Sequence, residues 1–175
     1  MKRMFYIGLI MLRFYSTSNA QGTSNSLAPE FLNQPFFVDA VNNRLVNLER
    51  QTMITKYRLK GMFVEFKGLK SPVRIGKADT VTFIIRVNSG TDPRDSFELV
   101  TLNEKKDKRE AQILGGGLSQ QKYVYKKIPY GLRKVDKGVY LLLVPSLSSG
   151  EYYFGSYGKT FAFGVDLDKE IKKEP

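Results

Sequence analysis

Strands are predicted wherever apolar side chains occupy every second position of the chain. Two segments, 61–67 and 80–87, show this period most clearly; their inward residues are Met62, Val64 and Phe66 in the first, and Val81, Phe83, Ile85 and Val87 in the second. A period of two is the pattern of a β-strand with one buried face. Turn-forming residues recur about every ten positions and no window keeps a helical period, so we expect an antiparallel β-sandwich, Ig-like or related.

Further strands are expected on both sides of these two. Short apolar runs within 35–50 flank Asn42 and Asn43, a pair that tolerates the positive φ angles of a hairpin turn. The stretch "FELVTLNEK" resumes an extended pattern, which we expect to end in the charged cluster that follows it. "VYLLLVP" (139–145) is apolar at every position, which predicts a central strand covered on both faces.

The segment "GEYYFGSYGKTFAFGVD" (150–166) predicts a terminal hairpin. Phe154, Phe161 and Phe163 fall on matching faces of its two strands. Because paired aromatic rings bury large areas, we expect these three in the core. Tyr153 lies on the opposite face and Tyr157 lies in the turn. These two tyrosines are therefore the candidates in this segment for stacking on a sugar or a protein partner.

The first twenty residues have the pattern of a cleavable export signal. Lys2 and Arg3 precede the apolar run "MFYIGLIML", and Ser18 and Ala20 give the small-x-small pattern of a cleavage site. Arg13 ends the apolar run well short of the ~20 residues that a membrane-spanning helix needs, so no transmembrane anchor is expected after cleavage. We therefore expect a signal peptide (1–20), a flexible leader (21–30), a single β-sandwich domain (31–167) and a charged tail (168–175).

The composition limits both the compartment in which the protein is expected and the reactions that its side chains can catalyse. The chain has 28 Lys and Arg, 17 Asp and Glu, and no Cys or His, and its net charge of +11 falls to +8 without the signal peptide. The lack of Cys excludes disulfides and a lipid anchor on cysteine, which is ordinary for an exported bacterial protein. The lack of both residues excludes Ser–His and Cys–His nucleophiles, the usual zinc sites and haem bound through His. We expect no cofactor, and a periplasmic, cell-surface or secreted protein.

These exclusions do not apply to catalysis by carboxylates. However, no pair of acidic residues has neighbours in the sequence that mark it as a catalytic or metal-binding pair. Asp92 and Asp95 flank a Pro-Arg turn, and Asp166 and Asp168 lie at the end of the last strand. Either pair has the oxygens that Ca²⁺ favours. Asp side chains near turns more often bond to backbone amides, so we assign no metal site. The glycines of "LGGGLS" lack the neighbours of a phosphate-binding loop and are interpreted as a connecting loop.

The basic segment 122–137, which we call the basic tract, is the strongest functional feature of the sequence. Cations and tyrosines are interleaved there, an arrangement that can hold an anionic polymer by charge and its sugars by stacking. The candidate ligand-binding residues are Tyr123, Tyr125, Lys126, Lys127, Tyr130, Arg133 and Lys134, together with Tyr153 and Tyr157. The alternative is a strand surface that Lys residues keep soluble and protect from edge pairing. Nucleic acid is not expected as the partner of an exported protein.

Three segments resemble a group of small exported β-sandwich proteins from Gram-negative bacteria. They are "PFFVDAVNNRLVNLER" (35–50), "GLKSPVRI" (68–75) and the terminal segment 150–166. Members of that group share an opening that contains Pro, two aromatic residues, Asp and Ala, and they share a Gly-Glu-Tyr ending. The resemblance implies export and a sandwich fold, and it implies no activity and no site residue.

These observations together favour a non-catalytic binding or accessory module of the bacterial cell envelope. Its expected partner is an envelope protein or an anionic or glycan polymer. One alternative is a structural subunit that assembles by strand addition. The other alternative is an enzyme, namely a glycan hydrolase that uses two carboxylates.

Overall fold

The structure is a computed structural model that describes residues 28–116, 121–156 and 159–166. These residues form fifteen β-strands and one short 3₁₀-helix, with no α-helix among them. The all-β, antiparallel prediction is confirmed, apart from one parallel pair of strands, β6 (Arg74–Gly76) and β15 (Lys159–Asp166). No helix in these ranges has the length and apolarity to span a membrane. The predicted signal peptide, most of the leader and the charged tail lie outside the described residues.

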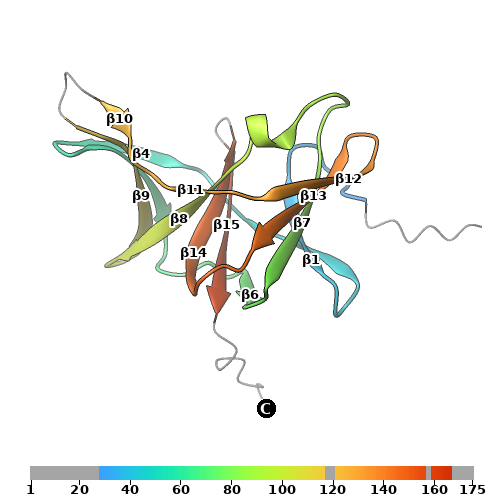
Figure 1. The fold of residues 1–175 in the computed structure, drawn as a ribbon. Coiled ribbons are helices and arrows are strands. Elements are labelled where there is room, and N and C mark those ends of the chain that lie inside the picture. Colours follow the sequence, from blue (N-terminus) through green and yellow to red (C-terminus); the bar gives the residue numbers. More distant parts are fainter. Residues whose placement is uncertain (1–27, 117–120, 157–158, 167–175) are drawn as a thin grey trace, which may run out of the picture.

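Five strands form the first sheet, which lies at one end of the molecule (Figure 1). In spatial order they are β12 (Gly131–Asp136), β13 (Val139–Pro145), β7 (Thr80–Arg86), β1 (Pro35–Asp39) and β2 (Arg44–Asn47). β1 and β2 form the hairpin that the sequence predicted around Asn42 and Asn43. Asn43 has a φ of 47°, a left-handed conformation that Asn tolerates better than most residues.

The second sheet closes on itself. In spatial order its strands are β3 (Glu49–Gln51), β15, β14 (Gly150–Ser156), β8 (Glu98–Lys105), β9 (Lys108–Gly115), β5 (Gly61–Lys67) and β4 (Ile54–Arg58). β3 and β4 stand at opposite ends of this order, yet only Thr52 and Met53 separate them in the chain. The sheet therefore wraps round until its two ends meet in one extended stretch, and we call it the closed sheet. Two short strands, β10 (Lys122–Tyr123) and β11 (Lys127–Ile128), pair with β9 and β8.

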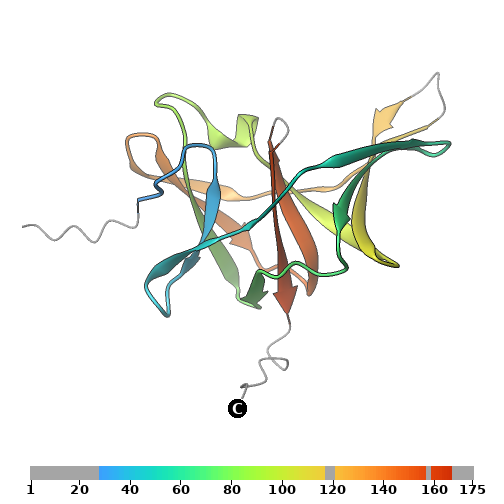
Figure 2. The ribbon, with the colours of Figure 1, turned by 180° about the vertical axis from the view of Figure 1, so that it is seen from behind.

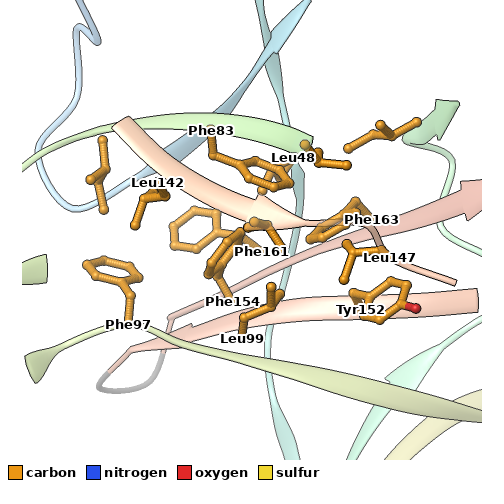
Figure 3. Close-up of a cluster of buried hydrophobic side chains, with 14 of the residues drawn as sticks. Leu48, Phe83, Phe97, Leu99, Leu142, Leu147, Tyr152, Phe154, Phe161 and Phe163 are labelled. Carbon is orange, nitrogen blue, oxygen red and sulfur yellow. The ribbon is translucent and has the colours of Figure 1, made fainter. Parts of the chain in front are cut away.

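The outer face of the closed sheet packs against the first sheet, an arrangement consistent with a β-sandwich. Side chains of β7 and β13 meet those of β8, β14 and β15 in the main apolar cluster (Figure 3). The ring centroid of Phe83 lies 5.0 Å from those of Phe154 and Phe163. Phe154, Phe161 and Phe163 are at most 1% exposed, so their predicted place in the core is confirmed.

A second apolar cluster fills the inside of the closed sheet. Tyr153 and Ala162 of the terminal hairpin point into it, and the other buried members are Val64, Phe66, Val100, Leu102 and Ala111. The ring of Tyr153 lies 5.0 Å from that of Phe66, measured between centroids. Tyr153 does lie on the face opposite the three phenylalanines, and the closed sheet covers that face as well.

Two other strands differ from the sequence expectation. β13 lies beside the edge strand β12 rather than in the middle of its sheet, and its outward Leu141 and Leu143 are only half-buried. In the charged cluster after β8, Arg109 and Glu110 belong to the next strand, β9, and are buried. Both residues are paired with opposite charges, as described below.

Replacing Phe163 by Ala should lower the free energy of unfolding by about 3–5 kcal/mol, because the change leaves a cavity where the two sheets meet. Val41→Ala, at a side chain that is 93% exposed, is the control and should change it by less than about 0.5 kcal/mol. Both values are measured by denaturant unfolding against the wild type. Equal, small losses at the two positions would contradict the assigned core.

Candidate functional site

A groove of about 450 Å³ opens at one end of the closed sheet, and we call it the mouth groove. This volume falls in the range of small-molecule binding sites. Its apolar and aromatic walls are formed by Met53, Met62, Val64, Ile113, Tyr123, Tyr125 and Tyr153. The other residues around it, mostly polar, are Thr55, Asp95, Ser96, Glu98, Gly155, Lys159 and Thr160.

The mouth groove exists because β8 and β9 separate towards this end of the closed sheet. On β8, direct pairing with β9 is confined to Asn103–Lys105. Nearer the mouth, β9 pairs with β10 and β8 pairs with β11, so the chain between these short strands fills the gap. The pairing of β5 with β9 also shifts by one residue beside Ile113, a bulge that increases the local twist.

Tyr123 and Tyr125 stand at the rim of the mouth groove. Their rings meet edge to face, with centroids 5.8 Å apart, and Tyr123 is 74% exposed. The hydroxyl of Tyr125 donates to the carboxylate of Glu98, and the ammonium of Lys127 pairs with the same carboxylate. Burial opposes the ionised form of Glu98, but these two hydrogen bonds outweigh it and lower its pKa. The rim therefore presents an open aromatic ring beside an ionised acceptor.

Tyr153 contributes to the floor of the mouth groove. A Cβ at Gly155 would lie 2.9 Å from the edge of the Tyr153 ring, which is too close. Because glycine has no side chain, the ring can occupy this position. Burial and, secondarily, the charge of Glu98 raise the pKa of Tyr153, so its hydroxyl stays protonated. Tyr153 lines the groove, where a small part of it, 5%, stays exposed. It is therefore able to bond to a ligand.

The structure brings together some of the predicted binding residues and separates others. Tyr123, Tyr125 and Tyr153 line the mouth groove. Tyr130 does not, because its ring packs on Phe154 in the main core and its hydroxyl donates to the backbone oxygen of Phe97 at 2.6 Å. Tyr157 lies outside the described residues.

The basic tract does not form a single cationic face. It runs from β10 at one end of the molecule, through β11, to β12 at the edge of the first sheet, as both ribbon views show (Figures 1 and 2). Arg133 and Lys134 are consecutive residues of β12, so their side chains point to opposite faces of that strand. Lys126 is exposed, and Lys127 is occupied by Glu98.

The inside of the closed sheet is charged at the end away from the mouth groove, where β14 reaches Glu151 and β9 reaches Arg109. The Arg109 side chain is fully buried, and it donates to Glu49 at 2.9 and 3.1 Å and to Glu151 at 3.2 Å. It also donates to the backbone oxygens of Lys67 and Gly68, each at 3.0 Å, so its five N–H groups are all used. We call these residues the ion cluster.

The ion cluster extends towards the end of β15. Glu151 also accepts the backbone N–H of Ser71 at 2.8 Å and the side chain of Arg74, which in turn pairs with Asp166. A Cβ at Gly164 would collide with the Arg74 guanidinium and lie 2.6 Å from Glu151 Oε1, so only glycine allows this approach. Sequence reasoning missed the cluster, and the Gly-Glu pair that opens the terminal hairpin was the signal nearest to it.

Two cations, one from the charged cluster after β8 and one from β4, pair with acidic residues on the outer surface of the closed sheet. Glu65 and Glu110 lie directly opposite each other on β5 and β9, where like charges would repel. Lys108 contacts Glu65 at 2.7 Å, and Arg58 contacts Glu110 at 2.8 Å. The hydrogen bond from Lys108 lowers the pKa of Glu65, and that from Arg58 lowers the pKa of Glu110. These cations balance neighbouring acids and add little free positive charge.

The acidic residues named from the sequence have different roles where the structure describes them. Asp92 caps the 3₁₀-helix η1 (Pro93–Asp95) by accepting the backbone N–H of Arg94 at 2.8 Å, so the interpretation as a capping residue is confirmed. Asp166 belongs to the ion cluster, and Asp168 lies outside the described residues. Over the described ranges, no three His, Cys, Asp or Glu side chains gather into a group that would hold a metal ion.

No protein-family model, curated protein sequence or solved structure matches this chain. The mouth groove as a candidate site therefore rests on its own geometry.

The ion cluster predicts a loss of stability in acid. Burial opposes the ionised form of Glu49, but hydrogen bonds led by those from Arg109 hold its pKa below the ordinary 4.5, and Arg74 holds the pKa of Asp166 below 3.8. A lowered folded-state pKa stabilises the fold above the ordinary value, and this contribution is lost as the pH falls through the folded pKa. Glu49→Gln should therefore be less stable than the wild type at about pH 7, and the difference should shrink below about pH 4.

The measurement is the denaturant midpoint of each protein across this pH range. Glu104→Gln, which removes an exposed carboxylate from the same closed sheet, is the control and should follow the wild type throughout. A difference between Glu49→Gln and the wild type that stays constant with pH would show that the charge of Glu49 does not stabilise the fold.

Proposed function

We propose that the protein is a non-catalytic binding module that is exported to the bacterial cell envelope and holds its ligand in the mouth groove. The observation that supports it most is the convergence of Tyr123, Tyr125 and Tyr153, from two distant segments, on one hollow of about 450 Å³. Aromatic and apolar walls with a few fixed polar groups are the usual composition of a ligand site. The Ig-like or related grouping of the sandwich belongs to this proposal, and the two packed antiparallel sheets support it.

A carboxylate-dependent hydrolase has less support. A glycosidase needs one carboxyl group with a raised pKa as its general acid, opposite a second carboxylate. In the mouth groove, the carboxylate of Glu98 is held by Lys127 and Tyr125, and its pKa is lowered. Glu98 is therefore suited to accept hydrogen bonds from a ligand and unsuited to donate a proton to a leaving group.

Assembly by strand addition also has less support at the edge strand β12. This strand carries Arg133 and Lys134, and its pairing with β13 is irregular between Lys134 and Asp136. Charged side chains and bulges are the features that keep sheet edges from pairing with other chains. The geometry accordingly favours a partner that enters the mouth groove.

The proposed partner is an envelope protein or a glycan rather than an anionic polymer. The sequence placed an anionic ligand on the basic tract, but the tract is spread over both sheets. The mouth groove itself has Asp95 and Glu98 beside its tyrosines, with Lys159 as the only cation along its lining in the described residues. Because Lys127 and Lys159 offset the charges of Glu98 and Asp95, the groove has no excess of positive charge to favour an anionic polymer.

The export part of the proposal is tested by intact mass. The protein recovered from the envelope or medium should begin at Gln21, because Ser18 and Ala20 form the expected cleavage pattern. A recovered protein that retains Met1 and partitions with membranes would contradict export by a cleaved signal.

The binding part is tested by blocking the mouth groove. Thr55 is exposed on β4 and lines the groove, so Thr55→Trp should fill it without disturbing the core. Lys56→Trp is the matched control, since the next residue of the strand points to the other face. Immobilised wild type and Lys56→Trp should retain a component of an envelope extract that Thr55→Trp does not, as measured by quantitative elution. Equal retention by all three proteins, or retention by none, would contradict the proposed function.

A further inference from the structure

The ring of Tyr123 is a fixed, open aromatic surface. Tyr123 lies on β10, where it pairs with Leu114 of β9. The ring of Tyr125 contacts one side of the Tyr123 ring, edge to face. A side chain held in this way loses little conformational freedom when a ligand covers it. The flat ring of Tyr123 is therefore suited to a flat ligand face made of C–H groups, and one face of a sugar ring is such a surface.

Hydrogen-bonding groups stand around this ring in different directions. Each oxygen of the Glu98 carboxylate accepts one bond, from Tyr125 or from Lys127, and a carboxylate oxygen has room for a second donor. At the floor, Tyr153 lines the groove, and burial raises the pKa of its hydroxyl, which therefore stays protonated and can donate a hydrogen bond. At the rim, Lys159 adds an ammonium donor. Sugar hydroxyls both donate and accept, so they match this mixed set.

Other ligand classes match the mouth groove less well. A wholly apolar ligand would bury Glu98 and the Tyr153 hydroxyl without new partners, which is costly for polar groups. An anionic ligand would meet the carboxylates of Asp95 and Glu98, and the two cations beside them, Lys127 and Lys159, leave no excess of positive charge to attract it. A neutral ligand with many hydroxyls avoids both costs.

We propose that the mouth groove binds a short segment of a neutral glycan, with one sugar stacked on Tyr123 and its hydroxyls bonded to Glu98 and Tyr153. This inference rests on the proposed function, because it names the ligand class of the same groove. It places recognition on the aromatic rim, and among the cations of the basic tract it gives a part only to Lys127, which holds Glu98 in place.

The probe is the polysaccharide fraction of a protease-digested envelope extract, immobilised on a biosensor, from the bacterium that encodes the protein. The wild type should bind this fraction, and periodate oxidation of the sugars should abolish binding. Because the ligand is neutral, raising the salt concentration should leave the affinity nearly unchanged.

Variants locate the contact. Tyr123→Ala should bind about tenfold more weakly, since an aromatic contact is worth about one factor of ten in affinity. Tyr57→Ala is the matched control, because Tyr57 is equally exposed, at 76%, but does not line the mouth groove, and its affinity should stay at the wild-type value. Tyr153→Phe keeps the ring and removes only the hydroxyl, so it should weaken binding while leaving the unfolding midpoint unchanged.

Several results would overturn the glycan inference. Binding to the undigested extract that survives periodate but is lost on protease digestion would identify a protein partner, and the proposed function would stand while the glycan assignment fell. Binding that disappears in high salt would identify an anionic polymer. Equal losses in Tyr123→Ala and Tyr57→Ala would show contact outside the groove. Failure of Thr55→Trp to reduce binding would remove both the glycan and the mouth groove as the binding site.

Discussion

The hairpin of β14 and β15 has large or apolar side chains on both faces, so two separate layers must cover it. Phe154, Phe161 and Phe163 point towards the first sheet, whereas Tyr153 and Ala162 point the other way. The first sheet alone would leave that second face in water, at a cost of about 25 cal/mol for each Å² of apolar surface. The chain supplies the second layer by closing the sheet through β3 and β4. The closed sheet, and the space inside it, follow from this requirement.

The two ends of that interior are completed in different ways. At one end, Arg109 is surrounded by Glu49, Glu151 and two backbone oxygens. A buried ion cluster adds little net stability, because desolvation of the charges offsets their attraction. Its five directed donors are nevertheless satisfied by one arrangement of β3, β9 and β14, which favours a single register. At the other end, the separation of β8 and β9 leaves the interior open, and the mouth groove is that opening.

Local pattern was enough to predict the elements whose signals are local. The alternation of apolar and polar residues predicted the inward face of β7, and the aromatic residues at matching positions predicted the terminal hairpin. Closure of the sheet has no local signal, because β3 pairs with β15 through Gln51 and Thr160, 109 positions apart. Arg109 stands in the charged run KKDKRE (105–110), and charged residues are almost never fully buried unless they are paired. Its partner Glu49 lies 60 positions away, so nothing near it in the sequence indicated burial.

The candidate site was also predicted only in part, because some of its residues are close together in the sequence and others are not. The aromatic residues Tyr123 and Tyr125 were visible as a local cluster, and the structure places both at the mouth groove. Their acceptor Glu98 was not visible, because it comes from β8 and reaches them only after the sheet has closed. The cations interleaved with these tyrosines drew attention to an anionic ligand, although Lys127 pairs with Glu98 and Arg133 lies on another sheet.

Net charge and recognition are therefore separate properties of this protein. Positive charge spread over both sheets acts at long range: it keeps the protein soluble and attracts it to anionic surfaces, over distances limited to about 10 Å at 0.1 M salt. Contacts at the mouth groove act at short range and depend on the position of single groups. Because Lys108 and Arg109 are paired with acids in the fold, the charge count of the sequence overstates the positive surface that a ligand meets. Long-range attraction by the net charge and short-range contact in the mouth groove are therefore distinct parts of the proposed binding.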